Sequence, residues 1–455
     1  MELPVRLSEI PAESANQYPL TSQQKDPNQT ERNFRHVVPT AWRIKGELRI
    51  DALMGALDDV VERHEALRTL VHYDESDGSL GYQEIRPPVP VPFTVHEIPT
   101  DPGPARDEIA VDLYVKLHEE GLEYSVIPSL RVALYRFDDS DAVLTLLTHH
   151  LFSDNWSIGV LRREIAACYN ARVNGVPAAL PAPAQYREYA AWEHEYLHSD
   201  KAAAARRFWV DNLAGAKIFA LPADRPYDPD TLTARTAVRE FLISAADSAK
   251  ITAGATRNRC TAWHLILTAG TVLAEQITGS SDITLLSVNN GRVAKDFHNT
   301  IGFFANLVPL RVQAGDCTSF KELMLLVRKA SVDAHQNMIP FGELLELAPE
   351  LMKPLEDPQA IPMAFNYVRP AVALAEIQLA GGVTPVIPPE EVPTMYHRGT
   401  CSWGLAGLRS GELRFVIEYE PGAVDPETID RWGSDFVDLL MAIADRPDQA
   451  WRSWR

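Results

Sequence analysis

Cysteine is scarce in this chain of 455 residues: there are four, with no CxxC pair and no His/Cys spacing typical of a metal site. We therefore expect neither a disulfide framework nor a zinc site, and a reducing compartment suits the chain. No apolar run approaches the roughly 20 residues of a membrane-spanning helix. The first residues lack the basic and then apolar layout of a signal peptide. These absences predict a cytoplasmic protein with no membrane partner.

Positive charge is also in short supply. Lysine and arginine number 43 against 62 aspartates and glutamates, which gives a formal net charge of −19. This balance argues against a general affinity for nucleic acid or for anionic membranes. The composition is otherwise that of a globular protein, 46% hydrophobic and 23% charged. The length suits two or three domains.

Apolar periodicity predicts strands that alternate with helices along the whole chain, which indicates a mixed α/β fold. The predicted strands cover 41–44, 82–85, 92–95, 130–137, 142–147, 238–243, 283–288 and 413–419. The predicted helices cover 51–69, 104–120, 158–173, 186–209, 261–279 and 318–335, and a last helix starts at Asp425. The proline-rich stretch 174–183 is the best candidate for a linker.

A pair of histidines marks the most informative turn. The buried strand 142–147 leads into His149 and His150, Asp154 follows, and helical spacing resumes at Ile158. Asn155 or Ser157 is available as the N-cap of that helix. Functional side chains are often placed on such turns because the flanking elements hold them rigidly.

Several motifs together resemble the condensation domains of nonribosomal peptide synthetases, which belong with the chloramphenicol acetyltransferase-like acyltransferases. The family pattern HHxxxDG is matched by 149–155, RHExLRT by 63–69, and IGxFVNxxxxR by 301–311. Weaker matches are 186–192, 221–226 and His335-Gln336 with Pro340-Phe341. Because the motifs lie in family order, the resemblance covers nearly the whole chain.

The resemblance implies two acetyltransferase-like halves, α/β (α+β) in class, arranged as a V-shaped pseudo-dimer with an active-site tunnel between them. We expect an N-terminal half at 1–180 and a C-terminal half at 181–455, in which 181–225 is a bridging segment. It also implies that a peptidyl or acyl carrier protein presents a phosphopantetheine thioester in trans. We expect no bound cofactor and no metal, a small-molecule or carrier-bound acceptor, and a free-standing, monomeric enzyme.

Acyl transfer from a thioester needs a base for the acceptor's proton and stabilisation of an oxyanion. His150 is the candidate general base, since a neutral imidazole accepts a proton near pH 7. The resemblance implies that Asp154 forms a buried ion pair with Arg292, which would fix the turn. We expect His149 to satisfy a backbone group.

Other residues have supporting roles in this interpretation. Asn155 replaces the family's glycine, and we expect it to keep the turn because asparagine tolerates a positive φ. Asn366 and Ser157 are candidate tunnel-lining residues. Arg63 and His64 are interpreted as structural residues at a helix end.

The presence of a base does not decide whether the acceptor is an amine or a hydroxyl. A free α-amine with a pKa near 8 needs little help from a base, whereas a hydroxyl needs much. Both amide and ester formation therefore remain. Two alternatives also remain: an acyltransferase that uses acyl-CoA without a carrier, and a non-catalytic module that docks carriers or partners.

Overall fold

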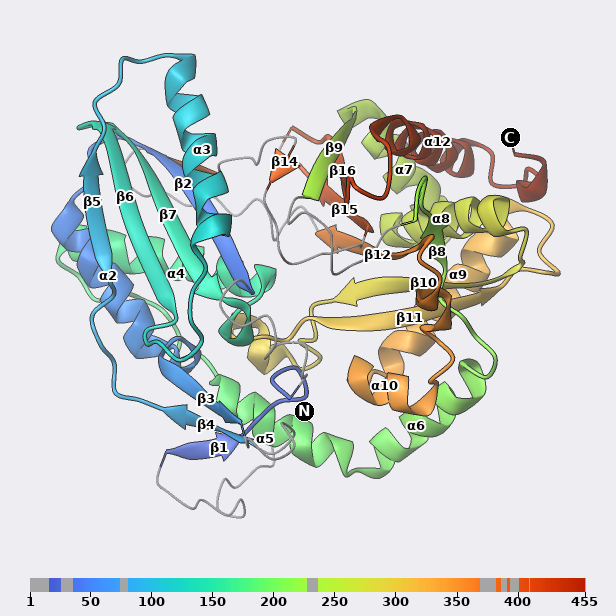
Figure 1. Cartoon of the computed structure of the whole chain (residues 1–455), viewed down its shortest axis with the longest axis horizontal. Helices are drawn as coiled ribbons and strands as arrows, with labels where there is room; N and C mark the ends of the chain where they lie inside the picture. Colours follow the sequence, from blue (N-terminus) through green and yellow to red (C-terminus); the bar gives the residue numbers. More distant parts are fainter. Residues whose placement is uncertain are drawn as a thin grey trace.

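The computed structural model describes residues 16–25, 36–73, 81–226, 236–368, 382–385, 391–392, 401–408 and 410–454. It contains two large mixed sheets that lie side by side, each with its own covering helices (Figure 1). Within the described ranges, no helix is long and apolar enough to cross a membrane.

The first sheet has five strands in the order β13-β2-β7-β6-β5. Their bounds are Gly382–Pro385 for β13, Val37–Lys45 for β2, Asp141–His149 for β7, Leu130–Asp138 for β6 and Phe93–Glu97 for β5. Every residue of the central strand β7 is buried. A strand covered on both faces needs apolar side chains on both, which explains the run at 142–147.

Helices cover both faces of this sheet. Helices α2 (Ile50–Arg63) and α4 (Asn155–Asn174) pack against each other and contribute to the same core as Leu144 and Leu146. Helix α3 (Pro104–Glu120) packs with Val143 on the opposite face. Strand β7 is thus held from two sides, and its C-terminal end is a rigid support for the residues that follow.

The second sheet has eight strands, ordered β11-β10-β12-β15-β16-β9-β14, with β8 paired to β12. Their bounds are Asn306–Gln313 (β11), Asp282–Asn289 (β10), Ala360–Val368 (β12), Cys401–Gly407 (β15), Leu413–Tyr419 (β16), Thr236–Ile243 (β9), Glu391–Val392 (β14) and Ala220–Pro222 (β8). Its helices are α7 (Ala245–Arg257), α8 (Ala262–Thr278), α9 (Phe320–Gln336) and α12 (Pro426–Asp445). The apolar helix α8 is buried as predicted.

Two helices run between the sheets along the lower edge of Figure 1: α5 (Tyr186–Leu197) and α6 (Asp200–Asn212). A small sheet of β1 (Gln17–Pro19), β4 (Gly81–Ile85) and β3 (Thr69–Tyr73) lies beside α5. The short α10 (Phe341–Leu347) contacts α6 and β11. Short 3-10 turns complete the chain: Glu65–Arg68, His150–Phe152 (η4), Lys295–Asn299 (η5), Lys353–Glu356 and Trp451–Ser453.

The mixed α/β class is confirmed, and three details differ from the sequence predictions. The predicted helix 51–69 ends at Arg63, because His64 adopts an extended conformation before a short turn and β3. The predicted helix 186–209 is two helices, separated at Ser199, which caps the second. Strand β13 comes from late in the chain yet completes the first sheet, pairing Val383 with Ile44. The predicted division at residue 180 stays a prediction.

Candidate active site

The double-histidine turn sits at the C-terminal end of β7. His149 is the last residue of that strand, η4 follows, and α4 begins at Asn155. The two histidines and Asp154 therefore lie in one tight connection between a buried strand and a 20-residue helix. Such a connection holds side chains in fixed positions because both flanking elements are packed.

His149 satisfies a backbone group, as expected. Its side chain is fully buried, and its Nδ1 accepts a hydrogen bond of 3.1 Å from the backbone N–H of Leu151. This bond caps the short turn η4. The Nδ1 atom is therefore unprotonated, and the imidazole is shielded from solvent.

His150 occupies a different environment and remains partly exposed. Its backbone N–H donates to the carbonyl of His36 at 2.8 Å. Its ring lies 4.7 Å from the ring of His36 and 4.4 Å from the ring of Phe303, measured between centroids. Access together with tight packing on two sides is what a positioned base requires.

The protonation state of His150 also suits a base. Burial disfavours the charged imidazolium and lowers the pKa of His150 below its ordinary value, and the Asp154 carboxylate opposes this shift only in part. The imidazole is therefore neutral at pH 7 and can accept a proton.

Asp154 is the hub of a buried polar network. Its Oδ1 accepts hydrogen bonds from the backbone N–H of Ser157 at 2.7 Å and from the Ser157 hydroxyl at 2.8 Å. Its Oδ2 accepts from the backbone N–H of Phe304 at 3.1 Å. Burial has the largest single effect and would raise the pKa of Asp154, but the charge and hydrogen bonds of Arg292, together with the hydrogen bonds from Ser157, outweigh it, and the pKa lies below its usual value.

Arg292 supplies the opposite charge from the segment that follows β10. The ion pair expected between Arg292 and Asp154 is present, with Nη1 2.8 Å from Oδ2 and Nη2 3.1 Å from Oδ1. The guanidinium also lies 4.1 Å from the centroid of the Phe304 ring. Because Arg292 follows Gly291, whose φ is +66°, the chain turns sharply just before it.

The prediction that Ser157 lines a tunnel is wrong. Its side chain is buried, and its hydroxyl joins Asp154, Arg292 and the backbone of Gly302. A hydroxyl suits this position because it can both donate and accept. Ser157 is therefore part of the brace around Asp154.

The segment 301–304 carries the other wall of the site. The hydroxyl of Tyr186 donates to the carbonyl of Phe303 at 2.5 Å, and lies 2.9 Å from the hydroxyl of Thr21. The carbonyl of Phe303 and the backbone N–H groups of Gly302 and Phe304 are thus all bonded by buried side chains. The sequence motifs assigned no specific role to Tyr186. The only signal for Tyr186 was its place at the start of a weakly matched motif.

The predicted N-cap of α4 is also wrong, and the turn is kept at Asn155 without the positive φ expected of asparagine there. The N-cap is Asp154, not Asn155 or Ser157. Asn155 is the first residue of the helix and is exposed. Among the described non-glycine residues, Arg259 is the one with a positive φ, so the φ of Asn155 is not positive. No left-handed conformation is therefore required where the family has glycine. The Asp154 carboxylate accepts a hydrogen bond from the backbone N–H of Ser157 in the first turn of the helix.

The remaining predicted residues fall elsewhere. Asn366 is partly buried within β12 and pairs with Gly404 of β15, and its contact with substrate stays a prediction. Arg63 and His64 both bind the Glu164 carboxylate, at 2.8 Å and 2.9 Å, and so join the end of α2 to α4. Both lie at the end of α2, where they were expected.

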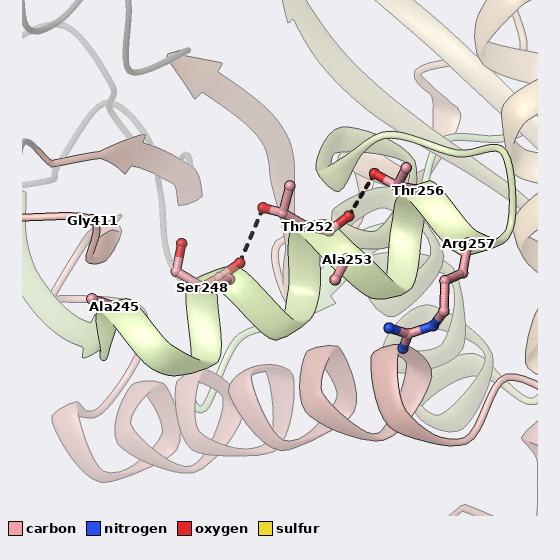
Figure 2. A pocket seen from close by; sticks show the side chains of 8 residues that line it. Ala245, Ser248, Thr252, Ala253, Thr256, Arg257 and Gly411 are labelled. Atoms are coloured by element: carbon pink, nitrogen blue, oxygen red, sulfur yellow. Dashed lines mark hydrogen bonds between the residues drawn. The ribbon is translucent and has the colours of Figure 1, made fainter.

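A shallow concavity on the surface lies away from this turn. Figure 2 shows that it follows one face of α7, lined by small residues such as Ser248, Thr252 and Ala253. Its one arginine, Arg257, donates to the carbonyl of Ala444. Its lining residues include hydroxyl groups, but no histidine, cysteine or carboxylate that could act as a base. In the described part of the chain, no cluster of three histidine, cysteine or acidic side chains is arranged to hold a metal ion.

Comparison with protein families gives a specific result. The family model described as the condensation domain matches residues 14–454. One component of the linear gramicidin synthase of Brevibacillus parabrevis is 28% identical over 423 residues, which cover 90% of this chain and 8% of that protein. The phosphinothricin tripeptide synthetase PhsC of Streptomyces viridochromogenes is 28% identical over 416 residues, 90% of this chain and 37% of that protein. The chain thus spans well under half of these relatives.

Solved structures agree over nearly the full length. SgcC5 from Streptomyces globisporus has a TM-score of 0.81 at 28% identity, covering 95% of this chain and 100% of that one. Its crystals contain (R)-(−)-1-(2-naphthyl)-1,2-ethanediol and sucrose. The X-domain from teicoplanin biosynthesis also has a TM-score of 0.81, at 21% identity, covering 98% of this chain and 99% of that one. The latter likeness establishes the fold alone.

Proposed function

Because this chain belongs to the condensation-domain family, we propose that it transfers an acyl or aminoacyl group from the phosphopantetheine thioester of a carrier protein to an amine or hydroxyl acceptor. The product is an amide or an ester, and the biosynthetic setting is that of nonribosomal peptides or hybrid natural products. The observation that carries this proposal is the partly exposed, neutral His150, held by packed rings beside a braced carboxylate.

The proposed step uses His150 as the general base. The imidazole takes the proton of the acceptor as the nucleophile attacks the thioester carbonyl, which gives a tetrahedral oxyanion. Collapse of this intermediate breaks the carbon–sulfur bond and expels the carrier thiol. His150 then returns its proton to the sulfur, so the enzyme ends as it began. Asp154 stays ionised throughout because Arg292 holds it, and the phosphopantetheine arm is substrate.

We propose a hydroxyl, rather than an amine, as the preferred acceptor. SgcC5, 28% identical to this chain, was crystallised with a diol. A hydroxyl stays protonated at neutral pH and so depends on a base, whereas about a tenth of an α-amine is already neutral. A base held in the neutral form by burial suits the more demanding acceptor.

The test is a transfer assay followed by mass spectrometry. A holo-carrier loaded with an aminoacyl group is incubated with the enzyme and an aryl ethanediol, or with the matching amino alcohol. We expect an ester with the diol, and a loss of about 10²- to 10⁴-fold in rate for His150→Gln. The exposed His198→Gln on the distant helix end is the matched control.

The same assay separates the alternatives. Equal rates with the acyl-CoA and the carrier thioester of one acyl group support an acyl-CoA-dependent enzyme. Carrier binding without product from any acceptor supports a docking module. Full turnover by His150→Gln overturns the role of His150.

A further inference from the structure

A third histidine lies against the proposed base. His36 immediately precedes β2, whose first residue Val37 is paired with His149. This register places residue 36 opposite residue 150, and the His150 backbone N–H donates to the His36 carbonyl at 2.8 Å. The two segments are more than one hundred residues apart in sequence, so only the sheet brings them together.

The side chains are in contact as well as the backbones. The imidazole rings of His36 and His150 have centroids 4.7 Å apart and planes inclined by 36°. Phe303 contacts His150 at 4.4 Å and 63°, and its ring is 6.2 Å from that of His36. These three distances place His36 and Phe303 roughly at right angles around His150. Each therefore limits the rotation of the His150 ring in a different direction.

Accessibility distinguishes the two imidazoles. His36 is only 3% exposed, whereas His150 is partly exposed. A substrate approaching from solvent meets His150 and cannot reach His36. His36 is thus unsuited to be a second base and suited to hold the first.

The segment that carries Phe303 is held in place independently of His36. Phe303 is held through its carbonyl by Tyr186, and its neighbours Gly302 and Phe304 are bonded to Ser157 and Asp154. His36 is held by β2, a strand paired on both of its edges. The His150 ring is therefore contacted on two sides, by the residue that precedes β2 and by a residue of the segment before β11.

We propose that His36 is a positioning residue for His150, holding the imidazole by ring contact in the orientation that meets the acceptor. This inference rests on the proposed function. Misplacing a reacting group by about 1 Å can cost roughly 10²-fold in rate. Ring contact requires a flat side chain at position 36, and phenylalanine supplies one of similar size without the nitrogens.

The test compares two substitutions at position 36 by steady-state kinetics. We expect His36→Ala to lower kcat by about 10- to 100-fold with little change in KM for the acceptor. His36→Phe should recover kcat to within about threefold of the wild type, because it restores the ring contact. Thermal unfolding of both variants reports whether the fold is intact.

A matched control is present in the chain. His96 of β5 stacks on Tyr135 with the same centroid distance, 4.7 Å, on an exposed face of the first sheet. His96→Ala removes an equivalent ring contact far from the turn. We expect its kcat to equal that of the wild type.

A second readout does not depend on turnover. In carbon–proton spectra of histidine-labelled protein, the Cε1–H signal of His150 is assigned by its loss in His150→Gln. We expect this signal to shift and broaden in His36→Ala, and to stay sharp in His36→Phe. The proposal is overturned if His36→Ala turns over as fast as the wild type. It is also overturned if the His150 signal does not move in His36→Ala.

Failure of the proposed function looks different. If the wild type forms no product with any donor and acceptor, the proposed transfer function is contradicted. The spectra then still decide whether His36 holds His150. A His36→Phe variant as slow as His36→Ala, with an intact fold, contradicts positioning by ring contact.

Discussion

Arg292 and Asp154 form a two-point ion pair across 138 residues of sequence, with Nη1–Oδ2 and Nη2–Oδ1 distances of 2.8 Å and 3.1 Å. The Arg292 side chain is 0% exposed and that of Asp154 4%. The pair joins the start of α4 to the segment after β10, so it links the histidine turn to the wall that carries Phe303.

The first prediction concerns the stability that this pair provides. We expect Asp154→Asn to lower the free energy of unfolding by about 3–5 kcal/mol, because it leaves the Arg292 charge buried without its counter-ion. Arg292→Leu should have an effect of similar size, for the converse reason. Urea unfolding followed by circular dichroism measures both.

The control for this prediction is an exposed ion pair. Lys329 and Asp333 lie one turn apart on α9, 2.6 Å between Nζ and Oδ2, and the lysine side chain is 72% exposed. We expect Lys329→Ala to change the free energy of unfolding by no more than about 0.5 kcal/mol. Equal effects for the two pairs would contradict the buried brace.

The second prediction concerns pH. Since burial lowers the pKa of His150, its neutral form persists to lower pH than that of an ordinary histidine. With a hydroxyl acceptor, which does not titrate in this range, kcat/KM should rise with pH and reach half its plateau below about pH 6.5. A profile from about pH 4.5 to 8 measures this midpoint. His150→Gln should lose the acid limb, and a midpoint above about 6.5 in the wild type would contradict the environment described for His150.

The third prediction concerns Asn155. Because this residue is exposed, starts a helix and has no need of a positive φ, Asn155→Gly should leave turnover unchanged. The free energy of unfolding should fall by no more than about 1 kcal/mol. Gly175, whose φ is +65°, is the sensitivity control: Gly175→Ala should cost about 1–2 kcal/mol. A tenfold gain in turnover for Asn155→Gly would show that the family's glycine matters for chemistry here.

The fourth prediction concerns Gly302. A Cβ atom at this position would overlap the ring of Tyr186. Gly302→Ala should therefore lower the free energy of unfolding by about 1–3 kcal/mol, and it should reduce kcat because the segment also carries Phe303. Differential scanning calorimetry and the transfer assay measure the two effects.

Gly342 of α10 is the matched control, since a Cβ there meets nothing within 4 Å. Gly342→Ala should stabilise the protein by up to about 1 kcal/mol, because glycine is a poor helix former. Opposite signs for the two alanine substitutions are the expected result. A stabilising Gly302→Ala would contradict the packing of Tyr186 on this segment.

Local signals explain which parts of the fold were predictable. Helix α3 runs from Pro104 to Glu120 as predicted, because Pro104 starts it and Gly121 ends it. Strand β12 was not predicted as a strand, and it contains Pro362, a residue that argues against a central strand. Strand β13 is four residues long and carries no periodic signal of its own. Its place beside β2 depends on a pairing across more than three hundred residues.

The sequence by itself determined the turn, its two histidines and its aspartate, because a buried strand, a double histidine and a helix lie next to one another along the chain. Through its motifs it also determined the family and the pairing of Asp154 with Arg292. Only the tertiary structure decided that Ser157 belongs to the brace, that Asn155 needs no special conformation, and that His36 and Phe303 enclose His150. These depend on which distant backbones the sheets bring together. Local spacing cannot encode such contacts, since each arises from strand register and from packing between segments far apart in sequence.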